Sequence, residues 1–219
     1  MNERDIVAEK GRPGGPAPRA LAGAAFRIAA AALEQLPPPG PPEVAFAGRS
    51  NAGKSSAINA IAGRRRLAYS SRTPGRTQQI VLFGLPNGAL VADLPGYGYA
   101  AVPKAVKQDW QRVLTAYVAT RATLVGLVLV VDARHGLKPL DETLLDGFLP
   151  SGRPVLVLAT KSDKLSRAES AGSLAAIRKD LERRYGPVAR GVRTIAFSAT
   201  DRTGVLEADA VLADWLGVA

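Results

Sequence analysis

Apolar and polar positions divide the chain into short hydrophobic runs separated by longer segments of mixed character. Six of these runs are predicted to be strands, since short apolar runs are typical of strands buried on both faces of a sheet. They are residues 44–47, 80–83, 89–92, 123–131, 154–159 and 192–197. Helical segments are predicted at residues 56–62, 104–121, 140–149, 167–185 and 206–216. Alternating strands and helices predict a three-layer α/β/α fold around a mostly parallel, six-stranded sheet.

One pair of neighbouring runs breaks this alternation. Residues 80–83 and 89–92 are separated by a short segment that contains Pro86, Asn87 and Gly88 and has no room for a helix. Such a segment is typical of a hairpin, which joins antiparallel strands. The sheet is therefore expected to have one antiparallel edge strand.

The first 42 residues differ in character from the rest of the chain. Residues 1–20 mix charge with proline and glycine and are predicted to form a flexible tail. Alanine content favours a helix in residues 21–36, although Phe26-Arg27-Ile28 alternates like an edge strand, and periodicity does not decide between them. Residues 37–42 form a stiff proline-rich spacer. A tail (1–20), an extension with its spacer (21–42) and one globular domain (43–217) are thus expected.

Composition restricts the class of protein. The absence of cysteine excludes disulfides, cysteine metal sites and a cysteine nucleophile. The formal charge of +10, with 21 arginines among 29 basic residues, favours a polyanionic partner such as nucleic acid. No apolar stretch reaches the roughly 18 residues that cross a bilayer. The alanine-rich residues 21–33 are interrupted by Arg27, so the chain is predicted to be cytoplasmic.

Residues 48–55 (GRSNAGKS) fit the phosphate-binding pattern G-x-x-x-x-G-K-[ST]. The pattern follows an apolar run and precedes a predicted helix, so backbone N–H groups and a helix N-terminus would face one phosphate group. Lys54 would hold the β- and γ-phosphates, and the hydroxyl of Ser55 would ligate Mg²⁺. The sequence therefore predicts a nucleotide-binding protein.

Two further motifs follow predicted strands and would reach the same edge of the sheet. In Asp93-x-x-Gly96, the aspartate can hold Mg²⁺ through a water and the glycine N–H can reach the γ-phosphate, although such turns are also common elsewhere. Residues 160–163 (TKSD) resemble the guanine motif, in which Asp163 accepts hydrogen bonds from guanine and Lys161 lies flat on the base. The alternative for Asp163 is a helix cap.

Two further segments, whose sequence signals are weaker, complete the set of predicted nucleotide-binding motifs. Ser198-Ala199-Thr200, after Phe197, resembles the small-residue motif whose backbone N–H contacts the guanine carbonyl. A threonine of the loop at 73–77 can complete the Mg²⁺ shell when γ-phosphate is present. Thr77 is preferred to Thr73 because it lies next to the following strand, and the alternative is a plain polar loop.

With these motifs in place, the chain resembles the EngB (YihA/YsxC) family of bacterial GTPases in the TrmE-Era-EngA-EngB-Septin-like superfamily. The resemblance rests on residues 42–56, 73–78, 93–99, 132–135 and 160–163 and covers about residues 34–216. It implies a Ras-like fold, Mg²⁺-dependent GTP hydrolysis, and a role in assembling the large (50S) ribosomal subunit that is needed for normal cell division and septation. It also implies a ribosomal RNA partner, and a monomer is expected.

The motifs and the resemblance together give a predicted set of GTP-binding residues. They are Gly48, Arg49, Ser50, Asn51, Ala52, Gly53, Lys54, Ser55, Gly75, Arg76, Thr77, Gln78, Gln79, Asp93, Leu94, Pro95, Gly96, Thr160, Lys161, Ser162, Asp163, Phe197, Ser198 and Ala199. Lys54 and Thr77 are the catalytic candidates, Ser55 and Thr77 the direct Mg²⁺ ligands, and Asp93 a ligand through water.

Tyr97 stands after the Asp-x-x-Gly motif, where a glutamine could have oriented the attacking water, so slow intrinsic turnover is predicted. Asn51 suggests a K⁺ ion beside the phosphates, since an asparagine at this place helps to hold K⁺ in related GTPases. The lone His135 is expected to fix its loop, and Tyr97, Tyr99 and Lys104 are alternative candidates for a nucleotide-gated contact surface. Core packing accounts for Trp110 and Trp215 better than base stacking does.

Two other classes of protein remain open at this point. A P-loop ATPase or kinase would share the phosphate loop but would not need Asp163. A nucleic-acid-binding module without turnover would keep the positive charge, although it would not need the full set of Lys54, Ser55, Thr77 and Asp93.

Overall fold

A computed structural model describes residues 19–69, 79–98 and 104–218 of the 219-residue chain. It has seven strands, five α-helices and four short 3₁₀ helices in these ranges. The strands are β1 (Ala25–Ala30), β2 (Glu43–Gly48), β3 (Ile80–Gly84), β4 (Leu90–Asp93), β5 (Leu124–Asp132), β6 (Val155–Thr160) and β7 (Val192–Ala196). The α-helices are α1 (Lys54–Ala62), α2 (Lys104–Thr120), α3 (Pro139–Phe148), α4 (Arg167–Tyr185) and α5 (Val205–Leu216). The 3₁₀ helices are Leu33–Gln35, Leu149–Ser151, Ser162–Lys164 and Gly186–Gly191.

The strands form one sheet in the order β1-β3-β4-β2-β5-β6-β7. β2 lies between β4 and β5 and pairs with both in parallel, and β6 and β7 continue the parallel pairing. β3 is antiparallel to β4 on one side and to β1 on the other. The carboxyl ends of β2, β4, β5, β6 and β7 therefore meet at one edge of the sheet, which is where ligands bind in such folds.

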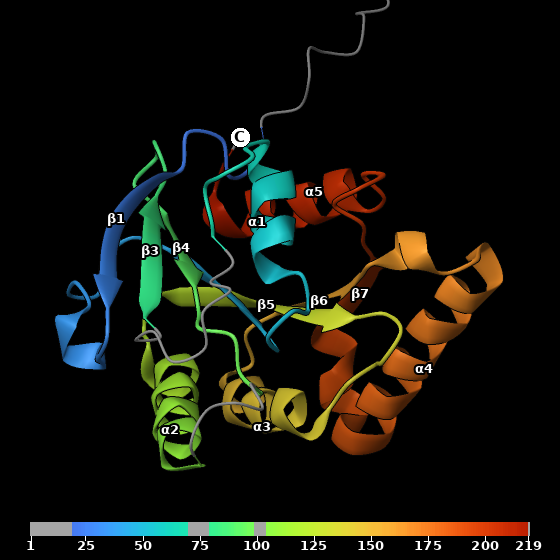
Figure 1. Ribbon diagram of the computed structural model, residues 1–219. Helices are drawn as coiled ribbons and strands as arrows, with labels where there is room; N and C mark the ends of the chain where they lie inside the picture. The colour runs from blue at the N-terminus through green and yellow to red at the C-terminus, as the bar shows by residue number, and fades with distance from the viewer. Residues whose placement is uncertain (1–18, 70–78, 99–103, 219) are drawn as a thin grey trace, which may run out of the picture.

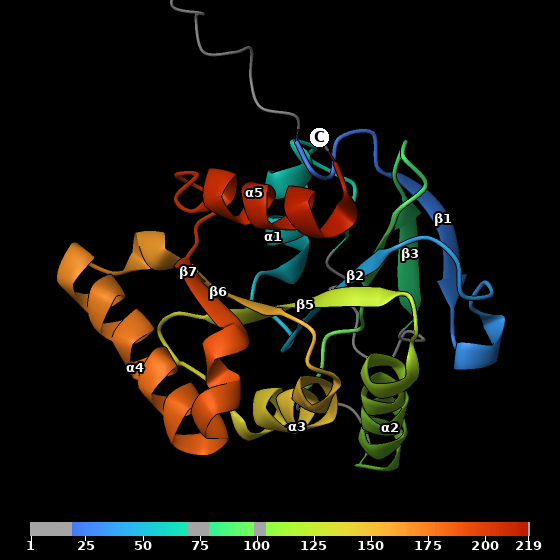
Figure 2. The same ribbon diagram turned by 180° about the vertical axis from the view of Figure 1, so that it is seen from behind.

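Helices cover both faces of the sheet, as Figures 1 and 2 show from opposite sides. α1 and α5 lie on one face, and their buried side chains pack with Phe46, Val128 and Leu156. α2, α3 and α4 lie on the other face, where they pack with the alternate positions of the same strands. Both sides of the central strands are buried, which explains their continuous apolar runs. The predicted three-layer α/β architecture is confirmed.

The sheet has seven strands rather than the predicted six, because residues 25–30 form β1 and not a helix. β1 pairs with β3 from Ala25–Gly84 to Ala30–Ile80, with a register shift between Phe26 and Ile28. The exposed edge of β3 offers a ladder of backbone partners, which outweighs the weak helix preference of alanine. The antiparallel strand predicted at the edge, β3, is therefore second from the edge.

The chain before β1 also packs against the core. Leu21 and Ala24 are fully buried between elements of the α1–α5 face. The N–H of Ala20 donates a 2.8 Å hydrogen bond to the carboxylate of Asp209 on α5. The segment that begins at Ala20 is thus fixed to α5, the last helix of the chain.

A buried carboxylate fixes the start of β2. Glu43 is fully buried and accepts hydrogen bonds from the hydroxyls of Tyr117 and Thr123 and from the guanidinium of Arg121, at 3.0 Å and 3.1 Å from its two nitrogens. Arg121 also donates to the backbone oxygen of Pro37 at 2.8 Å. This cluster joins the proline-rich spacer and the end of α2 to the central strand.

The two tryptophans differ in their surroundings. The ring of Trp215 packs against Gly126 of β5, where a Cβ would lie 2.3 Å from the indole, so core packing is confirmed for Trp215. Trp110 is half-buried on α2 and belongs to neither of the two core clusters. The prediction that Trp110 packs into the core stays a prediction, because residues 99–103 and the side chains of residues 104–107, which precede it in the chain, lie outside the described structure.

Candidate functional site

The phosphate-loop sequence joins the end of β2 to the start of α1, as predicted. Gly48 has no space for a side chain, because a Cβ would lie 2.6 Å from the backbone oxygen of Val130. Gly53 has a φ of +99°, a conformation that L side chains rarely adopt, and it directly precedes α1. Asn51 also has a positive φ, of +62°. The two glycines are therefore required for the tight turn that leads into the helix N-terminus.

The side chain of Lys54 forms an ion pair with Asp93, the last residue of β4. Both side chains are about nine-tenths buried, at 11% and 10% exposure. The pair forms because β4 lies parallel to β2, so that both strands end at the same edge of the sheet. Ser55 follows Lys54 in the first turn of α1 and is half-buried. The lysine, hydroxyl and carboxylate of the predicted phosphate and Mg²⁺ site are thus brought together.

The Asp-x-x-Gly segment after β4 lies along the phosphate loop. The N–H of Leu94 donates to the oxygen of Phe46 at 2.9 Å, and the N–H of Ser50 donates to the oxygen of Tyr97 at 2.7 Å. Gly96 passes so close that a Cβ would lie 3.4 Å from the Cα of Ser50. Residues 94–97 are therefore packed directly against β2 and the phosphate loop.

The side chain of Tyr97 is bound to α3. Its hydroxyl donates a 2.6 Å hydrogen bond to Asp141, which also accepts from the backbone N–H of Lys138 at 2.9 Å. Burial, reinforced by the neighbouring carboxylate, raises the pKa of Tyr97 well above its ordinary value. Burial also raises the pKa of Asp141, although its hydrogen bond from Tyr97 opposes that shift. The hydroxyl at the place of the missing glutamine is therefore engaged by a helix.

The predicted guanine motif begins at the end of β6, and its first two residues contact the phosphate loop. The hydroxyl of Thr160 donates to the backbone oxygen of Ala52. Lys161 has a φ of +59°, and its Nζ donates to the backbone oxygen of Asn51 at 2.7 Å and to Asp132 at 2.8 Å. The base-binding lysine of the prediction is thus held between two loops.

Asp132, the last residue of β5, was not among the predicted binding residues. Its carboxylate accepts hydrogen bonds from Arg134 at 2.7 Å and 2.9 Å as well as from Lys161. Burial would raise the pKa of Asp132, but these two cationic partners outweigh it and hold the pKa well below the ordinary value. Asp132 therefore fixes both the loop after β5, through Arg134, and the side chain of Lys161. A polar residue at the end of a buried strand was the signal in the sequence that could have identified it.

Asp163 is oriented by the loop after β7. The hydroxyl of Ser198 donates to Asp163 at 2.9 Å and itself accepts from the backbone N–H groups of Thr200 and Asp201. The hydrogen bond from Ser198 is the main reason that the pKa of Asp163 is lowered. The N–H of Ser162 donates to the oxygen of the buried Phe197 at 3.2 Å. The two predicted guanine-binding segments are therefore joined.

The structure also locates the remaining candidates. Gly75, Arg76, Thr77, Gln78 and Tyr99 lie outside the described residues, as does the side chain of Lys104, so their predicted roles stay predictions. Gln79 is exposed and immediately precedes β3. His135 is exposed, and its imidazole makes no hydrogen bond to the residues that the structure describes. The carboxylate of Asp132 fixes that loop instead of the predicted His135.

The donors present suit a nucleotide and Mg²⁺. The loop offers backbone N–H groups with Lys54, and Ser55 and Asp93 are the oxygen ligands that Mg²⁺ prefers. The buried hydroxyl oxygens of Ser50 and Ser162 have no hydrogen-bond partner within the described ranges. Over the same ranges, no three carboxylate or imidazole side chains form a metal cluster. Mg²⁺ is commonly held by one or two protein oxygens together with phosphates, which fits the side chains of Ser55 and Asp93.

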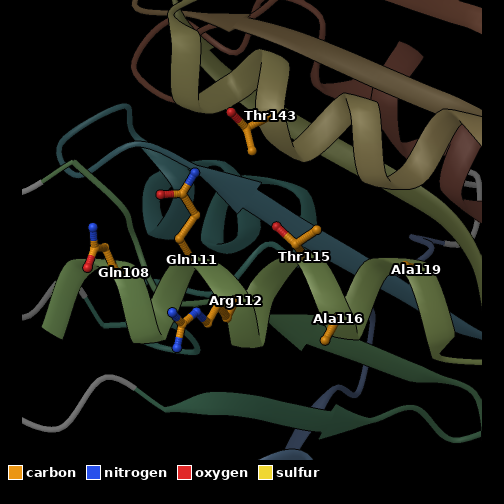
Figure 3. Close-up of a pocket in the computed structure, with 7 residues that line it drawn as sticks. All are labelled: Gln108, Gln111, Arg112, Thr115, Ala116, Ala119 and Thr143. Carbon is orange, nitrogen blue, oxygen red and sulfur yellow. The ribbon is translucent and has the colours of Figure 1, made fainter. Parts of the chain in front are cut away.

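Two hollows in the surface differ in their relation to these residues. One of about 200 Å³ lies between the phosphate loop and the end of β5, and its lining includes Asn51, Asp132 and Lys161. The other, of about 630 Å³, runs along α2, where Gln111 and Thr115 point toward Thr143 of α3 (Figure 3). The α2 hollow contains none of the predicted binding residues.

No helix in the described part of the chain is long and apolar enough to cross a membrane.

Comparison with known proteins places the chain among GTP-binding proteins. Residues 43–161 match the family described as "50S ribosome-binding GTPase". The "probable GTP-binding protein EngB" of Azoarcus sp. strain BH72 is 53% identical over 193 residues, covering 88% of this chain and 91% of that protein. A protein of the same description from Bordetella pertussis strain Tohama I is 48% identical over 201 residues, covering 88% of this chain and 94% of that one.

Solved structures show the same fold at lower identity. A crystal structure of a probable GTP-binding protein engB superposes with a TM-score of 0.64 at 22% identity, covering 80% of this chain and 98% of that one. Era in complex with MgGDPNP and nucleotides of 16S ribosomal RNA gives a TM-score of 0.58 at 22% identity, covering 80% of this chain and 56% of that one. At this identity the structural likeness shows the fold alone.

Proposed function

The chain belongs to the EngB family of GTP-binding proteins and is a GTPase, and we propose that it is a slow, Mg²⁺-dependent switch in assembly of the large ribosomal subunit. The observation that supports the switch most directly is the ion pair between Lys54 and Asp93. A nucleotide with its Mg²⁺ ion competes for both side chains. Binding therefore alters the start of the Asp-x-x-Gly segment, which packs along the phosphate loop through Ser50, Gly96 and Tyr97.

Each part of the nucleotide has a proposed set of partners in this chain. Lys54 and the backbone N–H groups of residues 48–54 hold the β- and γ-phosphates. Ser55 and Thr77 are the proposed direct ligands of Mg²⁺, with Asp93 acting through a water. When bound, Mg²⁺ neutralises negative charge on the phosphates.

Recognition of guanine is assigned to Asp163, whose two oxygens accept from the base. Ser198 holds that carboxylate in place, and a backbone N–H near Ala199 contacts the guanine carbonyl. Lys161 covers the base, and Asp132 positions Lys161 through the 2.8 Å ion pair. The GTPase family assignment removes the ATPase or kinase alternative and the module without turnover.

Turnover is proposed to be slow, because no glutamine follows Gly96. The hydroxyl of Tyr97 is bound to Asp141. Lys54 and Thr77 remain the catalytic candidates, through stabilisation of charge on the transferred phosphate.

We further propose that Asn51 helps to hold a K⁺ ion beside the phosphates. Asn51 is exposed in the loop, and its side chain makes no hydrogen bond to described residues.

The proposed partner is the large ribosomal subunit and its RNA. The family description, "50S ribosome-binding GTPase", and the charge of +10 support this assignment. Lys and Arg neutralise phosphates and release counterions, which gives strong binding to nucleic acid. A cytoplasmic, monomeric protein needed for normal division and septation completes the proposal.

Sedimentation with purified large ribosomal subunits tests this function. The protein should sediment with the subunits more strongly in a non-hydrolysable GTP analogue than in GDP. A Lys54→Ala variant, which cannot hold the phosphates, should show no difference between the two nucleotides. Association that ignored the nucleotide in the wild-type protein would contradict the switch, and no association at all would contradict the partner.

A further inference from the structure

The segment after α1 has a fixed shape, although it is rich in arginine. The side chain of Asn59 accepts hydrogen bonds from the N–H groups of Leu67 and Ala68 at 2.9 Å and 2.8 Å, and donates to the oxygen of Ala68 at 2.9 Å. Leu67 and Ala68 are buried, at 8% and 4% exposure. The side chains on either side of this pair are therefore presented from an ordered backbone.

Three arginines at this end of α1 are accounted for by the fold. The guanidinium of Arg64 donates to the oxygen of Ala24 at 2.6 Å, and that of Arg202 donates to the oxygen of Ala60 at 2.8 Å. The guanidinium of Arg19 lies over Gly63. Cations are favourable at a helix C-terminus, because its carbonyls carry partial negative charge.

Contacts with the C-terminal end of α1 do not account for Arg65, Arg66 and Tyr69. All three are exposed, and Tyr69 has 73% of its surface accessible. Neither arginine forms an ion pair with a residue in the described part of the chain. Between residues 44 and 92 the sequence contains seven basic residues and no acidic residue, so the local field is positive. A single exposed aromatic residue is ordinary by itself, but Tyr69 is within four positions of two exposed arginines.

The chemistry of the three side chains identifies a class of partner. Guanidinium groups bind phosphates with two parallel hydrogen bonds. An exposed tyrosine offers a face on which an unpaired base can stack, which is how proteins recognise single-stranded RNA. Duplex RNA does not offer free base faces. A basic surface alone would favour either kind of RNA, and the exposed ring favours the single-stranded one.

We propose that Arg65, Arg66 and Tyr69, here called the α1-end surface, bind an unpaired segment of RNA. The two guanidiniums contact its phosphates, and Tyr69 stacks on one base. The inference rests on the proposed function in taking RNA as the partner, and it adds the place and the form of the contact.

Arg65 and Arg66 follow the end of α1 that lies away from the phosphate loop, whereas Tyr69 follows Ala68, which is bound to Asn59 in the middle of α1. α1 runs for nine residues from Lys54 to Ala62, which places its two ends about 13 Å apart. In Figure 1, the C-terminal end of α1 lies beside the chain's C-terminus, at the opposite end of the helix from the phosphate loop.

Fluorescence anisotropy with two short RNAs tests the inference. One is a labelled single strand of mixed sequence, and the other is a duplex of the same length. The wild-type protein should bind the single strand more tightly than the duplex. Tyr69→Ala should weaken binding of the single strand about fivefold or more, whereas Tyr69→Phe should retain it, because the ring is kept.

The dependence on salt separates the phosphate contacts from stacking. Arg65→Glu combined with Arg66→Glu should weaken binding and lower the slope of log affinity against log salt by about 1.4. Tyr69→Ala should leave that slope unchanged. A matched control with the same change of charge, Arg167→Glu combined with Arg183→Glu on α4, should bind nearly as the wild type does. GTP binding and thermal unfolding of each variant establish that the fold is intact.

Several results would overturn the inference while leaving the proposed function in place. These are an equal loss of binding in the α4 control, wild-type affinity in Tyr69→Ala, or no binding of the single strand by a protein that still sediments with the large subunit. Anionic phospholipid vesicles serve as a further probe. If the α1-end variants lost binding to vesicles but not to RNA, the surface would be a membrane contact instead.

Discussion

The hydroxyl of Tyr97 donates a 2.6 Å hydrogen bond to the carboxylate of Asp141, 44 positions further along the chain. Tyr97 also pairs with the phosphate loop through its backbone, since its oxygen accepts from the N–H of Ser50. Asp141 in turn holds the start of α3 through the N–H of Lys138. The phosphate loop and α3 are thus linked through one side chain.

Removal of the Tyr97 hydroxyl should lower both the stability of the fold and the coupling between the phosphate loop and α3. Tyr97→Phe leaves Asp141 buried with one hydrogen bond fewer, which should reduce the free energy of unfolding by about 1.5 to 3 kcal/mol. Urea denaturation measures that change, and Asp141→Asn in a double-mutant cycle isolates the pair. If the two substitutions were additive, the bond would have no energetic role.

The identity of the residue at position 163 should decide which base is bound. Asp163→Asn replaces one acceptor by a donor, so affinity for GDP should fall by about a hundredfold or more and the preference should move toward xanthine nucleotides. Titration with fluorescent guanosine and xanthosine diphosphates measures both affinities. Asp180→Asn, an exposed change on α4, is the control, and an unchanged preference in Asp163→Asn would refute the assignment.

Asp132 should make stability depend on acid pH. Its pKa is lower in the folded protein than its ordinary 3.8, so its stabilising effect is present above that value and is lost as the pH falls below it. Asp132→Asn should therefore lose less stability than the wild type between about pH 5 and about pH 3. Chemical denaturation at the two pH values measures this. Equal losses would show that the ion pairs with Lys161 and Arg134 do not stabilise the fold.

The same substitution should weaken nucleotide binding, because Lys161 loses its charged partner. The expected loss for GDP is about tenfold, which is what one hydrogen bond to a charged group typically contributes. Arg134→Gln, which leaves the bond to Lys161 in place, separates positioning of Lys161 from stability of the loop. A larger effect of Arg134→Gln than of Asp132→Asn would contradict a role through Lys161.

The monovalent ion proposed beside Asn51 should appear in the kinetics. GTP turnover should be faster in K⁺ than in Na⁺ at equal ionic strength, and Asn51→Ala should remove the difference. Measurement of phosphate release in the two salts is sufficient. Equal turnover of the wild-type protein in both salts would exclude the ion.

The buried carboxylate of Glu43 should be required for folding. Glu43→Gln leaves Arg121, only 9% exposed, without its charged partner, which should cost about 3 to 5 kcal/mol. Glu142→Gln removes a partly exposed ion pair with Arg184 and should cost at most about 1 kcal/mol. Urea unfolding compares the two, and similar values would show that the cluster around Glu43 is not the anchor that its burial suggests.

The sequence predicts most strands of the sheet because they are continuous apolar runs bounded by turns. β1 is the exception, since its alanines and Arg27 satisfy a helix pattern equally well. What decides the matter is the pairing of Ala25 with Gly84, far along the chain, and local periodicity contains no information about such a partner. The buried residues Ala20 and Leu21 were missed for the same reason.

The candidate site shows a similar division. The phosphate loop, Asp93 and Asp163 are contained in short motifs, so they can be recognised without knowledge of the fold. Asp141 lies outside all the motifs, and Asp132 belongs to residues 132–135, which carry the family resemblance but suggested no role for it. The importance of the two carboxylates comes from Tyr97 and Lys161, which are 44 and 29 positions away. Only the three-dimensional structure shows such pairs.

The hydrogen bond between Ala20 and Asp209 spans 189 positions of the chain. During synthesis, the N-terminal segment can pair through β1 once β3 has been made, but Leu21 and Ala24 acquire their full cover only when α5 has left the ribosome. Completion of this bond therefore reports that the entire GTPase domain has been translated. Until then the apolar surface that α5 covers, which includes Leu21 and Ala24, is exposed to solvent.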